Sequence, residues 1–196
     1  MADGRIEKGR ETRERLLATG RALFGEHGYE ATSIDAILAA AGVARGALYH
    51  HFATKEALFD AVLDSVVAEI ADTAAEAALG AGPDPVAGLR AGCSAWLGMA
   101  LDPAIQRIAL LDPPSVVGWT RWRELDELHT LGRLRANLQA IAEAGRLPAD
   151  QVDVLAHMVL ASVNEAALMI ARAEDPAAAL SAGQAAVDTL LDRLVQ

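Results

Sequence analysis

The sequence contains little of what builds disulfide-stabilised or sheet-rich proteins. Its 196 residues include a single cysteine, and aromatic side chains account for only 4% of them. One cysteine, Cys93, excludes a disulfide within the chain and suits a reducing cytoplasm. Runs of β-branched and aromatic residues, which favour strands, are scarce, whereas alanine and leucine are abundant. The composition therefore predicts an all-α fold in a cytoplasmic protein. The N-terminal stretch is charged through Arg15 and has no uninterrupted apolar core, so we expect no signal peptide.

The sequence motifs of common enzyme classes are also missing. There is no glycine-rich phosphate-binding loop. Ser94 has the glycine that precedes the serine of a nucleophile elbow, but Trp96 stands where the second glycine is required. Asp126 and His129 have the spacing of two metal ligands on a helix, without a clear third ligand. We therefore expect a protein that is not an enzyme and that uses no cofactor and no metal.

The excess of positive charge that marks a general nucleic-acid binder is absent. The formal net charge is −10 at pH 7. Residues 1–60 hold 8 Lys and Arg against 9 Asp and Glu, a balance of −1, and residues 61–196 hold 9 against 18, a balance of −9. The acidity thus belongs to the C-terminal part. Affinity for DNA has to come from local cations, such as Arg10, Arg13, Arg45 and Lys55.

The longest apolar region, residues 149–173, is interrupted by polar side chains. It contains Asp153, His157, Asn164 and Glu165, which a lipid-exposed helix tolerates poorly. The first three of these need buried partners, a wet cavity or partners across a dimer. We expect a buried or interfacial helix here and no membrane partner.

Residues 32–59 have the pattern of two short helices joined by a turn. The one-face helical spacing i, i+3, i+4, i+7 is occupied by apolar residues, namely Ile34, Ile37, Leu38 and Ala41. Thr32 and Asp35 stand three apart at the start, which is the spacing of a capping box. Gly42 follows where this helix has to end, because glycine adopts the left-handed conformation of such a turn.

The second short helix, over residues 43–52, has two different sides. One side is apolar and suited to burial, with Val43, Leu48 and Phe52. The other side carries hydrogen-bonding and small residues, namely Arg45, Gly46, Ala47, Tyr49 and a histidine. A short helix with one slender, donor-rich side fits the major groove of DNA.

These residues resemble the DNA-binding motif of the TetR family of transcriptional regulators. The similarity runs through GV at 42–43, GALYHHF at 46–52 and KEAL at 55–58, and extends upstream to residues 12–24 and 27–29. The resemblance implies a bacterial protein whose residues 1–53 form a three-helix helix-turn-helix domain. A long fourth helix then leads into a ligand-binding and dimerisation domain, residues 54–196, which makes about nine helices in all.

Several residues of the motif are candidates for contacting DNA. Arg45 is the first choice for paired hydrogen bonds to guanine. Tyr49 is expected at a phosphate or a thymine methyl group, and Lys55, which begins the fourth helix, at a phosphate. Register with the family motif gives the backbone contact to His51 and a variable position to His50. The remaining candidates are the small Gly46 and Ala47, and Ser33 or Thr32, where capping alone is the alternative.

Turn signals place the other helices. The first is expected over about residues 8–25, and the fourth from Thr54, as N-cap, to about residue 79. Glycines and prolines at 80–85 mark the clearest break, and we expect a mechanical joint there. Later helices are expected over 86–100, up to 111, and over 119–144, 149–173 and 176–195.

A pocket for a largely apolar small molecule is expected among the helices of the C-terminal domain. Its candidate lining residues are Trp96, Met99, Arg107, Leu110, Trp119, Trp122, His129, Met158 and Asn164. Core packing explains each apolar residue equally well, and Arg107 fits a surface salt bridge. The last two helices carry more apolar surface than one helix pair needs. They are expected to form a homodimer interface, unless all of that surface packs within the monomer.

These patterns favour a homodimeric, ligand-responsive regulator, most often a repressor in the family, that binds a near-palindromic operator. A small molecule bound in the C-terminal domain would release it from DNA. The alternatives are an activator, a regulator without a ligand, or a helical binding protein or enzyme that does not bind DNA.

Overall fold

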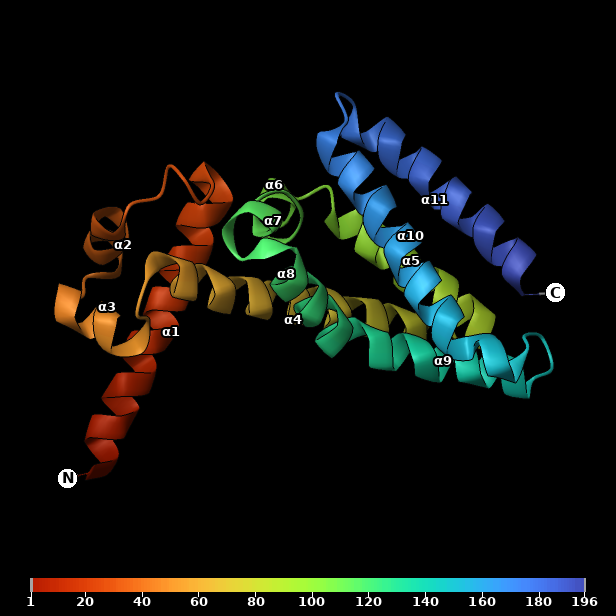
Figure 1. The fold of residues 1–196 in the computed structure, drawn as a ribbon, viewed down its shortest axis with the longest axis horizontal. Coiled ribbons are helices and arrows are strands. Elements are labelled where there is room, and N and C mark those ends of the chain that lie inside the picture. Colours follow the sequence, from red (N-terminus) through yellow and green to blue (C-terminus); the bar gives the residue numbers. More distant parts are fainter. Residues whose placement is uncertain (1, 196) are drawn as a thin grey trace. The chain divides into compact units, whose positions relative to one another are not determined.

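The computed structural model describes residues 2–195, and in this range the chain is helical with no strand. The all-α expectation is confirmed. The chain forms two compact units (Figure 1). The first runs up to Val66 and includes Pro103–Trp119, and the second combines Val67–Asp102 with the chain from Thr120 on. The expected division into 1–53 and 54–196 was drawn from motifs, whereas compactness divides the chain inside its fourth helix.

The N-terminal unit begins with the three helices expected from the motif, α1 (Ala2–His27), α2 (Ile34–Ala41) and α3 (Arg45–His51), followed by the start of α4 (Lys55–Gly80). Their apolar faces meet in one core that contains Leu16, Phe24, Ile37, Leu48, Phe52, Leu58 and Phe59. Removing each such side chain from water contributes about 1.5–3 kcal/mol. This core holds the two short helices, which are too short to be stable alone.

The start of α2 is capped differently from the expectation. Ser33 is the N-cap, and its Oγ accepts a hydrogen bond from the amide of Ala36 at 3.1 Å. Thr32 is 1% exposed and points into the core, so the expected capping box of Thr32 with Asp35 is wrong. The end of α2 agrees with the expectation, because Gly42 has the left-handed φ of 64°.

A segment distant in sequence completes this unit. It consists of α6 (Pro103–Ile105), the π-helix η1 (Gln106–Leu111) and α7 (Pro113–Val116). A Cβ added at Gly25 of α1 would lie 2.6 Å from the Cβ of Ala104, so only glycine permits this approach. The amide of Tyr29 donates to Oδ2 of Asp112 at 2.8 Å. Residues 103–119 therefore pack with the N-terminal helices, which sequence reasoning did not foresee.

The second unit contains the end of α4 and the remaining helices. These are α5 (Pro85–Met99), α8 (Gly118–Asp126), the π-helix η2 (Glu127–Leu131), α9 (Gly132–Glu143), the 3₁₀ turn η3 (Ala149–Gln151), α10 (Val152–Arg172) and α11 (Pro176–Leu194). The single helix expected over 119–144 is thus interrupted by a wider π-helical turn. In Figure 1, α10 and α11 lie side by side as an antiparallel pair.

The break at residues 80–85 is a corner inside the second unit. Asp84 caps α5 by accepting from the amide of Val86 at 3.2 Å, and it also accepts from Arg146 at 3.3 Å. Cβ atoms added at Gly88 and Gly92 would lie 3.2 and 3.1 Å from the backbone oxygens of Ala78 and Ala74. The helices on both sides of residues 80–85 pack closely within one unit, and the expected mechanical joint there stays a prediction.

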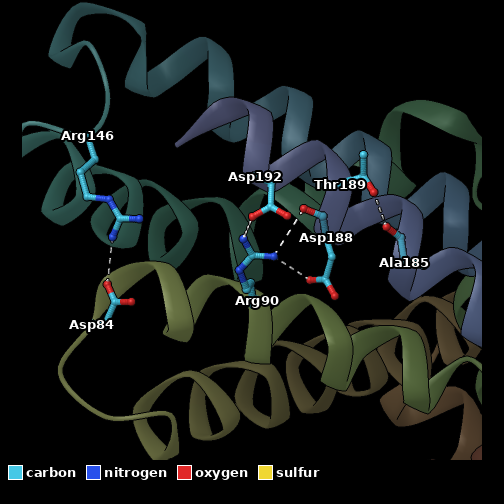
Figure 2. Close-up of polar contacts among 7 residues, drawn as sticks. All are labelled: Asp84, Arg90, Arg146, Ala185, Asp188, Thr189 and Asp192. Carbon is cyan, nitrogen blue, oxygen red and sulfur yellow. Dashed lines mark hydrogen bonds and ion pairs between the residues drawn. The ribbon is translucent and has the colours of Figure 1, made fainter. Parts of the chain in front are cut away.

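Polar contacts also join α5 to α11. Figure 2 shows Arg90 between Asp188 and Asp192, with an Arg90 Nη1 to Asp188 Oδ1 distance of 3.1 Å. Nearby, Nε2 of Gln184 donates to Oγ of Ser94 at 2.7 Å. These contacts fix the position of α11 along α5.

Candidate functional site

The side of α3 that faces away from the core is open. Arg45, Gly46 and His50 are exposed, and Tyr49 is 46% exposed. No atom lies within 4 Å of a Cβ added at Gly46. Leu48, on the opposite side, is fully buried. The helix therefore presents the small and donor-bearing residues together, which is the shape that enters a major groove.

Arg45 forms an ion pair with Asp35, the second residue of α2. Nη2 of the guanidinium donates to Oδ1 of the carboxylate, and both side chains are largely exposed. Sequence reasoning gave Asp35 only a role in a capping box. The available signal was its place on the exposed side of α2, ahead of a turn that brings α3 back toward α2.

His51 is half-buried against α1. A Cβ added at Gly9 would lie 4.0 Å from its Cε1, and the guanidinium of Arg13 lies 5.4 Å from the centre of the neighbouring Phe52 ring. Burial lowers the pKa of His51, and the charges of His50 and Arg13 lower it further. His51 is therefore mainly neutral at pH 7 and donates one N–H, which suffices for a phosphate contact.

Lys55 is engaged within the protein. Its Nζ donates to the backbone oxygens of Tyr29 at 2.9 Å and of Thr32 at 3.0 Å, and lies 3.9 Å from the centre of the Tyr29 ring. An ammonium group has three N–H donors, and two carbonyls and an aromatic face account for them. Lys55 thereby holds the loop that leads into α2, and its expected phosphate contact stays a prediction.

Thr32 is likewise engaged within the protein. Its hydroxyl donates to the backbone oxygen of Gly28 at 2.8 Å and lies 3.1 Å from that of Leu23. Because this hydroxyl is buried, the expectation that Thr32 contacts DNA through it is wrong. Ser33 is exposed, and its hydroxyl hydrogen stays available while its oxygen caps α2. Of the two alternatives, Ser33 is the one that can reach a phosphate.

The candidates for effector binding do not all fall in one unit. Arg107, Leu110 and Trp119 belong to the first unit, and Arg107 Nη1 would be 3.2 Å from a Cβ added at Gly28. Arg107 thus packs with the N-terminal helices, and its expected role in effector binding stays a prediction. Met158 is also a poor candidate, because it is 58% exposed on α10. Within the second unit remain Trp96, Met99, Trp122, His129 and Asn164.

A partly buried polar chain links three helices of the second unit. Nε1 of Trp96 on α5 donates to Oδ1 of Asn164 on α10 at 2.8 Å. Nδ2 of Asn164 in turn donates to Oδ2 of Asp126, at the end of α8, at 2.6 Å. Burial raises the pKa of Asp126 to about 6, although Arg123 and the Asn164 hydrogen bond oppose this shift. Sequence reasoning included Trp96 and Asn164 but considered Asp126 only as a metal ligand.

Asp153 and His157 of α10 also have partners. Asp153 lies 2.5 Å from Nη2 of Arg135 on α9, and Nε2 of His157 lies 3.5 Å from the same atom.

The one cysteine is unreactive, because burial raises the pKa of the Cys93 thiol to about 12. A thiol that stays protonated is a poor nucleophile.

Comparison with known proteins assigns the chain to a family. Residues 16–62, which contain the helix-turn-helix, match the model of bacterial regulatory proteins of the tetR family. Residues 86–194, more than half of the chain, match the model of the tetracyclin repressor-like C-terminal domain. The chain belongs to the TetR family. It is a DNA-binding transcriptional regulator and not an enzyme.

Individual members of the TetR family resemble the chain over most of its length. The HTH-type transcriptional repressor AcnR of Corynebacterium efficiens is 32% identical over 158 residues, which cover 78% of this chain and 77% of AcnR. The crystal structure of a TetR-family regulator from Pectobacterium atrosepticum is 37% identical and covers 96% of both chains, with a TM-score of 0.84. The structure of RolR in complex with resorcinol has a TM-score of 0.71 and covers 97% of this chain and 98% of RolR. At 19% identity it shows the fold alone.

Proposed function

We propose that this TetR-family protein is a homodimeric repressor, which binds a near-palindromic operator and is released by a small molecule. The observation that carries the proposal is the open side of α3, where Arg45, Gly46 and Tyr49 are exposed on a helix anchored by the buried Leu48. Two copies of this helix would enter successive major grooves. The similarity to AcnR, which is named a repressor, supports repression.

Dimerisation through α10 and α11 accounts for their exposed apolar side chains. Val154, Met158 and Met169 on α10 are 58–65% exposed, and Leu190 on α11 is 42% exposed. Residues 149–172 form the one described helix that is long and apolar enough to cross a membrane, and 33% of its most apolar window is buried. A partner's α10 and α11 would cover this surface and explain its hydropathy without a lipid bilayer.

We propose that the effector binds in the second unit, near Trp96, Asn164 and Asp126. A mostly apolar interior with a few convergent polar groups is the usual composition of a small-molecule site. RolR, which shares the fold, has been crystallised with resorcinol. Resorcinol is an apolar ring with two hydroxyl groups, and such a molecule would suit a mostly apolar site with a few polar side chains. The effector has to bind the state that cannot hold DNA more tightly, because equal binding would shift nothing.

The test begins with selection of duplexes from a random DNA pool by the purified protein. The expected product is a sequence with two-fold symmetry, bound with strong salt dependence as the dimer. A reporter gene placed behind that operator should be repressed by the protein and induced when the effector is supplied. If folded dimer, refolded to remove any bound ligand, enriches no sequence at low salt, the proposal is wrong. An increase in reporter expression would favour the alternative of an activator.

A further inference from the structure

Asp35 is a carboxylate bonded to the exposed side of α3, the side that carries Arg45, Gly46 and Tyr49. Asp35 lies on α2, and its Oδ1 accepts a hydrogen bond from Nη2 of Arg45 on α3. The turn that contains Gly42 separates the two helices. The two side chains are 77% and 56% exposed. The packing of α2 and α3 on a shared core therefore places the Asp35 carboxylate next to Arg45, the first candidate for a hydrogen bond to a base.

This pairing limits what Arg45 can do at DNA. A guanidinium has five N–H donors in a rigid fork, so engagement of Nη2 by Asp35 leaves the other donors in a defined orientation. The carboxylate is attracted to the arginine but repelled by a phosphate. An arginine that contacts only phosphate would hold a negative group close to the DNA backbone. Paired hydrogen bonds to the N7 and O6 of guanine would offset that repulsion.

We propose that Asp35 is a positioning residue that determines specificity, because it orients the guanidinium of Arg45 for a base edge and disfavours its use on phosphates. Asp35 touches no base in this role and acts through Arg45. The inference rests on the proposed function, since it needs an operator that Arg45 reads.

The test compares two affinities for each variant, one for the selected operator and one for a shuffled duplex of the same composition. Asp35→Asn removes the charge and keeps the size of the side chain, and Asp35→Glu restores the charge. Glu26→Gln serves as the matched control, because Glu26 is in the same unit and its side chain is 72% exposed, close to the exposure of Asp35. The unfolding temperature of each variant shows whether it folds.

For Asp35→Asn we expect binding of shuffled DNA to become about two- to fivefold tighter, the range of an exposed ion pair. The operator-to-shuffled ratio should fall by a similar factor. The salt slope on shuffled DNA should steepen by about 0.9, because one more cation reaches a phosphate. Asp35→Glu should restore the ratio, and Glu26→Gln should leave it unchanged. In an Arg45→Ala background, Asp35→Asn should no longer change the ratio.

Two results would overturn the role of Asp35. One is an Asp35→Asn protein that keeps the wild-type ratio, and the other is an equal fall of the ratio with and without Arg45. In both cases the wild-type protein still prefers its operator, so the proposed function stands. A wild-type protein that binds all duplexes equally would instead overturn the proposed function, and the role of Asp35 with it.

Discussion

The helix-turn-helix and the C-terminal helices of this regulator make polar contacts over different sequence separations. Around α2 and α3, Thr32 bonds to a residue four positions away and Arg45 to one ten positions away. In the second unit, Asn164 bonds to residues 38 and 68 positions away. The DNA-reading part is thus specified by a short motif, whereas the polar chain of the body depends on three separate helices meeting.

The largest expected effect tests whether the second unit controls the first through dimerisation. Met158→Asp places a charge on the exposed apolar side of α10. If this side is covered in the dimer, an unpaired buried charge should weaken dimerisation and operator binding by about a hundredfold or more. Sedimentation and operator titration measure both.

Ala140→Asp is the control for this prediction. Ala140 is exposed on α9, so this substitution adds the same charge elsewhere in the second unit. A Met158→Asp protein that remains a tight dimer would show that this side of α10 is not the interface.

The next prediction concerns the buried carboxyl of the second unit. Because burial raises the pKa of Asp126 in the folded state from its ordinary value of 3.8 to about 6, the folded protein holds a proton between these values that the unfolded chain has lost. Stability contributed by this group should therefore fall as the pH rises from 4 to 6, by up to about 3 kcal/mol. Urea unfolding at fixed protein concentration, from pH 4.5 to 7.5, measures this fall.

Asp126→Asn should flatten that pH profile, whereas Asp150→Asn, at an exposed acid of η3, should leave it as in the wild type. Parallel profiles for Asp126→Asn and wild type would mean that the carboxyl titrates normally.

Within the first unit, Arg45→Ala should have the strongest effect on DNA reading. Loss of a bidentate contact to guanine is worth about 1–3 kcal/mol, so operator affinity should fall by about five- to 150-fold. The affinity for shuffled DNA should change little, and the unfolding temperature should stay the same, because the side chain is exposed. Arg146→Ala, in the second unit, is the control. An Arg45→Ala protein that retains its operator preference would show that another residue contacts the base.

A smaller effect is expected from Lys55→Met, which keeps the length of the side chain and removes the ammonium. Lys55 donates hydrogen bonds to the backbone oxygens of Tyr29 and Thr32 and so holds the loop before α2. Loss of these bonds should lower the affinity for all duplexes alike, by about threefold or more. The salt slope should be unchanged, which is the decisive measurement. A slope reduced by about 0.9 would return Lys55 to the phosphate contact that the motif alone suggested.

The smallest effect is expected from Arg90→Ala, which removes the ion pairs between α5 and α11. Both acidic partners are more than half exposed, so screening by water and salt leaves a cost of about 1 kcal/mol or less. Thermal unfolding at low and high salt measures it, and the difference from wild type should shrink at high salt. Arg193→Ala, at an exposed position of α11, is the control. A loss that is independent of salt would assign Arg90 a packing role.

Sequence reasoning performed best where the information is local. The α2 helix, its glycine end at Gly42 and the buried Leu48 of α3 follow from spacing and turn chemistry over about twenty residues. It was weaker where a side chain had several possible partners. Thr32 and Lys55 were both candidates for DNA contacts, and the fold also offers each a carbonyl within 3.0 Å. The pairing of Asp35 with Arg45 could not be predicted before α2 and α3 were packed together.

The amino-acid sequence by itself determined that this protein is all-α, that it carries a helix-turn-helix near its N-terminus and that its charge lies mainly in the C-terminal part. These properties depend on composition and on the 3.6-residue period, both of which are written along the chain. Only the tertiary structure decided that residues 103–119 pack with α1 and that Asp126 joins Trp96 through Asn164. Such contacts form between segments tens of residues apart, and their geometry is set by the packing of whole helices, which no local pattern specifies.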